Sequence, residues 1–361
     1  YTEVKKKILF MVSSMNIGGV EKSLLSLLGV IPKDKYDITV LTLDKRGGFL
    51  EYIPEHVKIV EAEWFKEIKP IIMEAPQNTI KIYLKFGKIF KIISFIYSYY
   101  KSKNTGDRYI YYKNILKSIP VNEGYYDVAI AYAGPTEIID AYIGHKVKAK
   151  KKIAWVHFDI SKHKVNFKLY EKLYEKFDKI FVVSQEANKK LNEIIPSTEN
   201  KSEVLLNIIS KDLIAEMANE KVNFDNDFDG LKIVTVGRLS KEKGQDLAIN
   251  ALYKLINDGY KVRWYCIGEG NARKEYEYLI EENNLKNDFI LLGAIPNPYP
   301  YIKNSDIYVQ TSRHEGYCLT LAEAKCLCKP IVTTNFIGAY EQINDKVNGF
   351  IVEQNENEIY E

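Results

Sequence analysis

Two carboxylates, Glu315 and Glu323, lie in a stretch that is suited to binding a phosphorylated sugar. Residues 306–312 form an apolar run typical of a buried strand, and residues 319–327, rich in Leu and Ala, predict a helix after a short loop. The free N–H groups and positive dipole of a helix N-terminus bind anions such as phosphate. Seven residues separate the two glutamates, whose carboxylates would accept hydrogen bonds from sugar hydroxyls. Taken alone, this spacing also fits two solvated surface charges.

A basic loop earlier in the chain has the composition of a diphosphate site. Arg238 follows the predicted strand 231–236, and Lys243 lies just before a helix that we expect to begin at Gln245. Open parallel sheets bind diphosphates at strand ends and helix N-termini. Two cations at this point can neutralise a leaving diphosphate without a metal ion. The alternative is a solvated basic loop.

Two features of the first half of the chain also lie where parallel strands end. Gly18 and Gly19 stand between the predicted strand 7–12 and a helix, where backbone without side chains can approach a ligand, although a tight turn alone would explain them. The dinucleotide pattern G-x-G-x-x-G is absent there, so we expect no cofactor. His157 follows the predicted strand 152–156, a position typical of ligand contacts, although a lone histidine is more often structural.

The acidic pair Asp225 and Asp227 has the D-x-D spacing of a divalent metal site. Such a pair usually follows an apolar strand, whereas here it precedes one in a polar turn, so we expect no metal ion. The four cysteines all lie beyond residue 265, and no histidine stands near them at a ligand spacing. We expect small buried thiols in a reducing cytoplasm rather than a disulfide framework.

Strands alternate with helices along most of the chain, which predicts α/β architecture with parallel sheets covered on both faces. The 361 residues are 46% hydrophobic, enough for two such domains, and the net charge of +3 does not favour a nucleic-acid partner. The predicted strands are residues 7–12, 37–43, 57–62, 127–131, 152–156, 179–184, 204–206, 231–236, 262–267, 290–292, 306–312 and 331–334. We place the domains at 1–205 and 206–361, with a hinge in the polar span up to Gly230.

One segment, residues 64–118, interrupts the alternation with a basic and aromatic composition. It has eleven Lys or Arg against three acids, and twelve aromatic residues. Lysines and apolar residues recur near helical spacing, which predicts an amphipathic helix suited to an anionic membrane surface. Lysines interrupt every long apolar run, so a transmembrane span is not expected. A solvated face packed on its own domain fits equally well, and a nucleic-acid groove fits less well. The spaced residues are Lys81, Lys85, Lys88 and Lys91, with Ile82, Phe86, Ile89, Ile93 and Ile96.

The motifs taken together resemble the retaining glycosyltransferases with the GT-B fold, of the family-four, group 1 type. The likeness rests on Gly237-Arg238-Leu239, on Lys243-Gly244 and on the two glutamates of the strand–loop–helix stretch, and it extends over nearly the whole chain. It implies two Rossmann-like domains facing each other across a cleft. It also implies retaining, metal-independent transfer of a hexosyl or N-acetylhexosaminyl group from a UDP-linked donor to an acceptor hydroxyl of a bacterial surface polysaccharide or lipid-linked saccharide.

The resemblance also assigns roles to individual residues. Arg238 and Lys243 would hold the diphosphate, Glu315 would bind hydroxyls of the transferred sugar, Glu323 would bind the ribose, and His157 would lie near the reacting carbon. The Gly18-Gly19 turn would face the donor phosphates and the acceptor. The remaining expected donor contacts are backbone groups, those of Leu319, Thr320 and Leu321 at the diphosphate and those of Ala294 and Ile295 at the base.

The chain departs from the family pattern in two places. Asn207 is followed by Ile208 where the family often has Asn-Gly-Val-Asp, and the chain ends at Glu361, so we expect a truncated C-terminal tail. We expect a cytoplasmic enzyme able to bind peripherally at the inner face of the membrane. Two alternatives share this fold: a non-catalytic nucleotide-sugar-binding subunit, and a nucleotide-sugar epimerase, which needs no acceptor.

Overall fold

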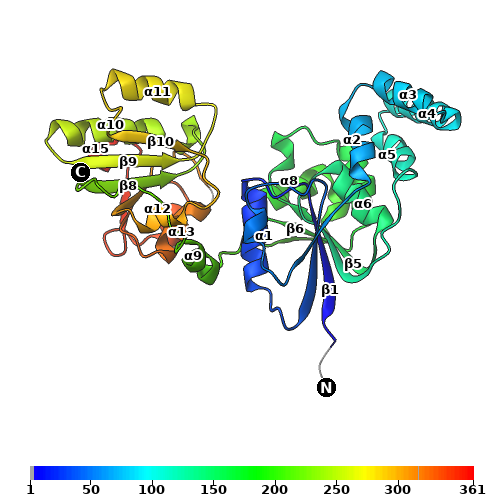
Figure 1. The fold of residues 1–361 in the computed structure, drawn as a ribbon, viewed down its shortest axis with the longest axis horizontal. Coiled ribbons are helices and arrows are strands. Elements are labelled where there is room, and N and C mark those ends of the chain that lie inside the picture. The colour runs from blue at the N-terminus through cyan, green and yellow to red at the C-terminus, as the bar shows by residue number, and fades with distance from the viewer. Residues whose placement is uncertain (1–3, 316) are drawn as a thin grey trace. The chain divides into compact units, whose positions relative to one another are not determined.

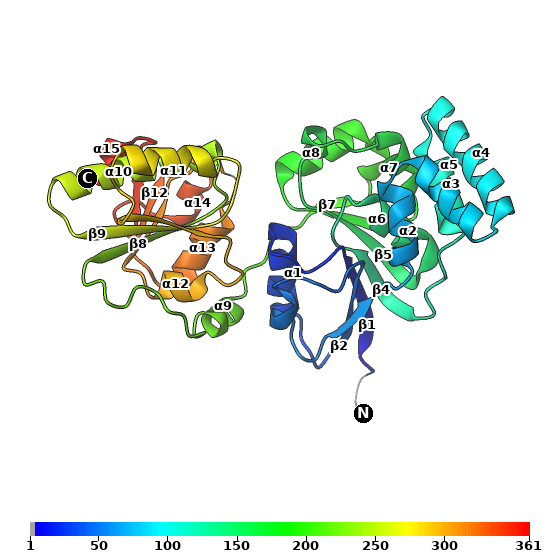
Figure 2. The same ribbon diagram turned by 45° about the horizontal axis from the view of Figure 1, so that its top comes forward.

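The computed structural model describes residues 4–315 and 317–361 and divides into two compact units, one ending at Ile208 and the other running from Ile209 to Glu361. Each unit has one parallel sheet with helices on both faces (Figure 1, Figure 2). An all-parallel sheet requires a crossover between successive strands, which is the alternation that the sequence predicts. The α/β fold with two Rossmann-like domains is therefore confirmed.

The first unit is built on seven strands in the order β3-β2-β1-β4-β5-β6-β7. Its central strands are apolar because both faces of the sheet are covered, and Leu9 and Met11 are 1% exposed or less. The strands are β1 (Lys6–Val12), β2 (Tyr36–Thr42), β3 (Lys58–Glu61), β4 (Tyr125–Ala131), β5 (Lys148–Val156), β6 (Lys179–Val182) and β7 (Ser202–Val204). The covering helices and turns are α1 (Gly19–Val30), η1 (Leu50–Tyr52), α6 (Glu137–Lys146), η2 (Ile160–Lys162), α7 (Phe167–Tyr174), α8 (Gln185–Ile194) and η3 (Pro196–Thr198).

The basic aromatic segment folds as four helices of this unit. They are α2 (Phe65–Met73), α3 (Pro76–Lys85), α4 (Ile89–Thr105) and α5 (Arg108–Leu116). The prediction of one amphipathic helix through residues 81–96 is wrong. Gly87 adopts φ +65° in the turn that separates α3 from α4. Both views place α3 and α4 next to each other at the edge of the unit (Figure 1, Figure 2), so they form a helical hairpin.

The second unit has six strands in the order β10-β9-β8-β11-β12-β13. Its core packs helix side chains such as Leu252 against strand side chains such as Trp264. The strands are β8 (Leu231–Val236), β9 (Val262–Ile267), β10 (Phe289–Gly293), β11 (Ile307–Gln310), β12 (Ile331–Thr334) and β13 (Phe350–Val352). The helices and the one turn are α9 (Lys211–Met217), η4 (Lys241–Lys243), α10 (Gln245–Asn257), α11 (Arg273–Glu282), α12 (Tyr299–Lys303), α13 (Leu319–Cys326), α14 (Ala339–Gln342) and α15 (Glu356–Tyr360).

The strand order reverses once in each sheet. In the first unit β1 lies between β2 and β4, and in the second unit β8 lies between β9 and β11. The crossovers on the two sides of such a switch point leave toward opposite faces, which opens a crevice at the carboxyl ends of the two strands. Across the part of the chain that the structure describes, no helix is long and apolar enough to cross a lipid bilayer.

Candidate functional site

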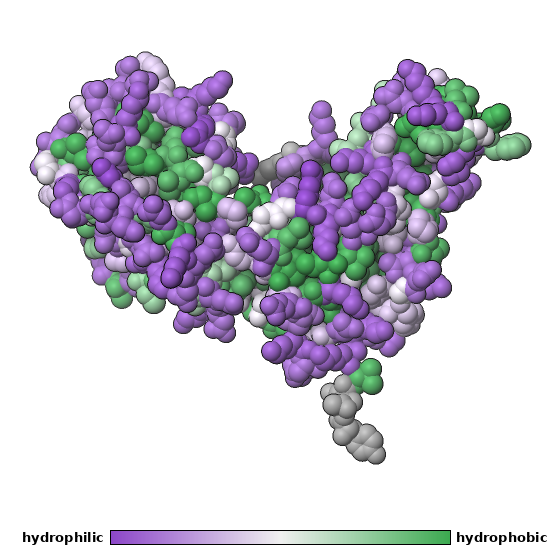
Figure 3. Space-filling view, viewed as in Figure 1, coloured by the Kyte–Doolittle hydropathy of each residue, from purple (hydrophilic) through white to green (hydrophobic). Residues whose placement is uncertain are grey.

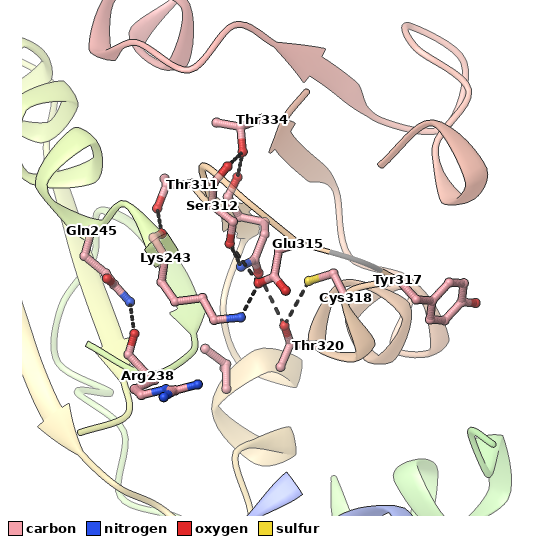
Figure 4. Close-up of polar contacts among 12 residues, drawn as sticks. Arg238, Lys243, Gln245, Thr311, Ser312, Glu315, Tyr317, Cys318, Thr320 and Thr334 are labelled. Atoms are coloured by element: carbon pink, nitrogen blue, oxygen red, sulfur yellow. Dashed lines mark hydrogen bonds and ion pairs between the residues drawn. The ribbon is translucent and has the colours of Figure 1, made fainter. Parts of the chain in front are cut away.

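The predicted phosphate and sugar residues of the second unit meet at its switch point. β8 pairs with β11, so the loops that follow these two strands are neighbours although they lie far apart in sequence. Arg238 and Lys243 are on the loop after β8, and Glu315 is on the loop after β11. The sheet therefore brings together three side chains that the sequence assigns to one site (Figure 4).

Lys243 and Glu315 form an ion pair in this structure. The Nζ atom of Lys243 donates to the Oε1 atom of Glu315, and the two side chains are only 22% and 12% exposed. The sequence predicts a role for each residue but not their contact. A bound diphosphate would therefore meet a lysine that already has a carboxylate partner (Figure 4).

A chain of buried hydrogen bonds orients Glu315. The hydroxyl of Tyr308 donates to Oε1 of Gln310 at 2.6 Å, and Nε2 of Gln310 donates to Oγ of Ser312 at 2.7 Å. The Ser312 hydroxyl then donates to Oε1 of Glu315 at 3.0 Å, and Thr320 donates to Gln310 at 3.3 Å. A carboxylate can only accept hydrogen bonds, so the chain that runs from Gln310 through Ser312 ends at Glu315. Sequence reasoning missed Tyr308, Gln310 and Ser312, because polar side chains in and just after a short strand carry no distinctive pattern.

Arg313 clamps the two loops together. Its guanidinium donates to both carboxylate oxygens of Asp246, at 2.7 and 2.5 Å, and also to the carbonyl of Lys241 at 2.8 Å. Its backbone N–H donates to the carbonyl of Glu242 at 2.7 Å. Hydrogen bonding to Asp246 holds the pKa of Arg313 above its ordinary value. Because a bidentate fork fixes both distance and angle, the loop after β11 is held in place against the start of α10, and the bonds to Lys241 and Glu242 hold it against the loop after β8.

The loop after β8 also packs closely against the loop after β11 at Gly244. This residue adopts φ +67°, and a Cβ atom there would lie 2.2 Å from the carbonyl oxygen of Thr311. The Thr311 hydroxyl in turn donates to the carbonyl of Lys243 at 2.9 Å. Only glycine fits a left-handed conformation in such contact, which explains the glycine after the predicted phosphate lysine.

Arg238 supplies the exposed positive charge of the site. Its backbone carbonyl accepts from Nε2 of Gln245 at 2.9 Å, which fixes the chain at the end of β8. Among the described residues its guanidinium has no carboxylate partner, and it points to the same side as the ammonium group of Lys243 (Figure 4). The two side chains can therefore approach one anion from the same direction.

The predicted anion cradle is the start of α13. Leu319, Thr320 and Leu321 form its first turn, where backbone N–H groups have no acceptor within a helix. Cys318 precedes them with φ 57° and ψ 85°, a left-handed conformation that costs energy in a residue other than glycine. Gly316, expected in the loop after Glu315, lies outside the described residues.

Glu323 lies deeper than the sequence suggests. It is 4% exposed on α13, and its carboxylate accepts a hydrogen bond from the hydroxyl of Tyr299 on α12. Burial and this carboxylate raise the pKa of Tyr299. The ribose role of Glu323 stays a prediction, as does the base contact of Ala294 and Ile295, which follow the carboxyl end of β10 in the same unit.

The first unit carries its candidate residues at the carboxyl ends of β1 and β5. Gly18 precedes α1 and Gly19 begins it, and a Cβ atom at Gly19 would meet nothing within 4 Å. Tyr132, just after β4, links α1 to the end of β5: its hydroxyl pairs with Ser23 at 2.6 Å, and its carbonyl lies 2.6 Å from Nε2 of His157. Sequence reasoning missed Tyr132, which joins the strand ends that the sequence treats separately.

The contact with Tyr132 fixes the chemistry available to His157. A carbonyl oxygen only accepts hydrogen bonds, so Nε2 carries the hydrogen and Nδ1 keeps a free lone pair. Burial lowers the pKa of His157 to about 4, although the bond to the Tyr132 carbonyl acts in the opposite sense. At neutral pH this ring is uncharged, so it can accept a hydrogen bond through Nδ1 but cannot serve as a positive charge.

Asp140 is a buried residue that holds the loop containing Gly134 and Thr136, next to His157. It is fully buried on α6, and its Oδ2 atom accepts from the hydroxyl of Tyr170 at 2.8 Å and from the N–H of Thr136 at 3.1 Å. The N–H of His157 donates to the carbonyl of Gly134 in the same loop at 3.3 Å. Burial raises the pKa of Asp140 to about 7.

Asp225, the first residue of the D-x-D pair, has structural partners. Asp225 accepts from Nη1 of Arg263 at 2.6 Å and from the hydroxyl of Tyr265, so its carboxylate ties the polar span to β9. Within residues 4–315 and 317–361, no group of three or more His, Cys, Asp or Glu side chains is arranged to hold a metal ion.

Known families and structures give the same picture of the fold. Residues 217–360 match the family model for glycosyl transferases group 1. An uncharacterized glycosyltransferase of Methanocaldococcus jannaschii is 29% identical over 46% of this chain and 42% of its own length. The N-acetylgalactosamine-N,N'-diacetylbacillosaminyl-diphospho-undecaprenol 4-alpha-N-acetylgalactosaminyltransferase of Campylobacter jejuni is 33% identical over 55% of this chain and 53% of its own length. The chain thus spans about half the length of these curated relatives.

Solved structures resemble the chain over almost its full length. Anabaena HepE in complex with UDP-glucose covers 98% of this chain, with 88% of its own chain matched, a TM-score of 0.61 and 17% identity. TarM covers 99% of this chain, with 91% of its own chain matched, a TM-score of 0.61 and 16% identity. The chain therefore has the GT-B fold seen in these structures, and its residues 217–360 are similar to the glycosyl transferases group 1 family.

Proposed function

We propose that this protein is a retaining, metal-independent glycosyltransferase that moves a sugar from a UDP-linked donor to an acceptor hydroxyl. The observation that carries the proposal is the cluster of Arg238, Lys243 and Glu315 beside the start of α13, at the switch point of the second unit. Two cations and a helix N-terminus suit a diphosphate, and a carboxylate next to them suits sugar hydroxyls.

The transfer depends mainly on charge stabilisation and positioning. Arg238, Lys243 and the first amides of α13 stabilise the leaving diphosphate, and Glu315 holds the sugar through its free carboxylate oxygen. The leaving phosphate oxygen takes the acceptor proton on the same face of the sugar, so the configuration at the anomeric carbon is retained. His157, uncharged at neutral pH, accepts a hydrogen bond from the sugar instead of donating a proton.

Relatives of the chain support the proposed classes of donor and acceptor. HepE was solved with UDP-glucose, and one relative is named as a transferase acting on a diphospho-undecaprenol saccharide. Another, 28% identical over half of this chain, is a poly(ribitol-phosphate) alpha-N-acetylglucosaminyltransferase. We therefore propose a hexosyl or N-acetylhexosaminyl donor and an acceptor that is a bacterial surface polysaccharide or a lipid-linked saccharide.

The test begins with thermal shifts against a panel of nucleotide sugars, since a ligand that binds only the folded state raises its stability. The stabilising donor is then incubated with saccharide acceptors, and UDP release and product configuration are measured with and without EDTA. Acceptor-dependent UDP release with retained configuration in EDTA is the expected result. Loss of turnover on chelation, an inverted product, conversion of the donor without an acceptor, or binding without turnover would each overturn the corresponding part of the proposal.

A further inference from the structure

The α3–α4 hairpin exposes an apolar stripe on its outer surface. Along α4 the side chains of Ile89, Phe90, Ile93, Tyr97 and Tyr100 are between 57% and 88% exposed. Their spacing is that of a single helix face. Leu84 and Phe86 continue this apolar stripe at the end of α3 and the turn that follows it, and they are 60% and 65% exposed.

The exposure of the stripe is not a lack of packing in the hairpin as a whole. The opposite face of α4 carries Ile92 and Phe95, which are 9% and 1% exposed, and Phe95 packs against Tyr83 of α3 and Tyr111 of α5. The hairpin therefore has its own core, and its outer apolar side chains do not take part in that core. Figure 3 shows apolar side chains gathered at the outer end of the region where Figure 1 places α3 and α4.

The surroundings of the apolar stripe are positively charged. Between Glu74 and Asp107 the sequence has six lysines and no acidic residue. The lysines nearest the stripe are exposed, and none of them pairs with a carboxylate in the part of the chain that the structure describes. These lysines are Lys81, Lys85, Lys88 and Lys91.

A basic groove borders the middle of α4. It has a volume of about 560 Å³ and is lined by residues of α4, α5 and α6, among them Ser94, Lys113, Lys117 and Lys146. Its histidine, His145, has a pKa lowered first by burial and then by the charges of nearby lysines, which marks the positive potential there. A groove of this charge suits a phosphate-bearing headgroup.

The combination of exposed apolar side chains and unpaired lysines on the α3–α4 hairpin indicates what kind of partner this surface can bind. A nucleic acid offers phosphates but no apolar interior in which Leu84 or Ile93 could be buried. A second copy of the same hairpin would bring lysines against lysines. An anionic lipid bilayer provides both an apolar layer and negative headgroups.

We propose that the α3–α4 hairpin is a membrane-docking surface for anionic lipid. The apolar stripe enters the headgroup boundary of the bilayer, and the lysines around it, with those of the basic groove, contact the negative headgroups. The binding is reversible, because charges that salt can screen and a few inserted side chains hold the hairpin at the surface. This docking is independent of the transfer reaction.

The test is co-sedimentation of the full chain with vesicles of phosphatidylcholine containing phosphatidylglycerol, and with vesicles of phosphatidylcholine alone. We expect binding to the anionic vesicles at low salt and its loss at high salt, because salt screens the lysine charges. Replacing Lys81, Lys85, Lys88 and Lys91 with Glu should lower the partition coefficient by at least about 100-fold. The pair Phe86→Ser with Phe90→Ser should lower it by about tenfold at any salt concentration.

A matched control changes the same number of charges elsewhere on the first unit. Lys33, Lys35, Lys148 and Lys189 are exposed and lie outside the hairpin, so their replacement with Glu should leave most of the binding intact. Circular dichroism and thermal unfolding should be unchanged in all variants, because every substituted side chain is exposed. The proposal is overturned if wild-type protein ignores anionic vesicles at low salt or if the control loses as much binding as the hairpin variant. Self-association of the lipid-free protein that is abolished by the Phe pair would also overturn it.

Discussion

Replacing Glu315 with Gln should strengthen the binding of free UDP while it weakens transfer. In the structure Lys243 is paired with the Glu315 carboxylate, and a bound diphosphate would have to share this lysine and lie near a negative charge. The amide removes that charge but still accepts the hydrogen bond from Ser312. The sequence alone predicts almost no effect of Glu315 on free nucleotide, so the ion pair changes the expectation.

The expected size follows from the exposure of the pair. Exposed ion pairs contribute less than about 1 kcal/mol, and hydrogen bonds to charged groups about 1.5–3 kcal/mol. Lys243 is 22% exposed and Glu315 is 12% exposed, so the pair falls between these cases. A gain of about 1–2 kcal/mol corresponds to roughly 5- to 30-fold tighter UDP binding. Loss of the sugar contact should reduce kcat by about 100-fold or more.

The assay is calorimetric titration with UDP, followed by initial rates of transfer. Glu282→Gln on α11 is the control, since it makes the same charge change at an exposed position outside the site. Glu323→Gln should have the opposite sign and weaken UDP, because this residue is expected to bind the ribose. Weaker UDP binding in the Glu315 variant, or equal effects of the two variants, would refute the reasoning.

Three further predictions concern other contacts. Arg238→Ala should weaken UDP by about 1.5–3 kcal/mol in the same titration, with EDTA having no effect. Arg313→Ala should reduce transfer without changing the overall fold, because it releases the fork to Asp246, and Arg313→Lys should not restore activity. The pKa of Asp140 is raised, so its contribution to stability is full below its unfolded value and is lost as pH rises through about 7. In urea unfolding at several pH values, the wild type should lose on the order of 4 kcal/mol of stability as the pH rises to about 7, and Asp140→Asn should not show this loss. An equal pH slope in both proteins would contradict this.

The elements that hold the site were predictable because their signals are local. The predicted strands 231–236, 262–267 and 331–334 coincide with β8, β9 and β12, since each is a short apolar run with turn residues at its ends. Arg238 and Glu315 could each be placed at a strand end from the sequence. Their proximity depends on the pairing of β8 with β11, which sequence spacing does not encode.

The contacts between the loops could not be predicted for the same reason. The fork from Arg313 to Asp246 and the chain through Gln310 join residues whose neighbours in sequence give no sign of the partner. In the hairpin, Gly87 lies within a run of helical spacing, where a glycine is a weak signal for a break. The spacing showed an apolar face but not that most of this face remains in contact with solvent.

The fork between Arg313 and Asp246 has a consequence for engineering donor preference. It couples the loop after β11, which carries Arg313, to the first turn of α10, which carries Asp246 and directly follows the loop after β8. A chimera that exchanges only one side of this contact with a relative would separate Arg313 from Asp246 and misalign Lys243 with Glu315. The two loops transplanted together with the first turn of α10 would keep their alignment, so this set is the smallest whose exchange can change the sugar without dismantling the site.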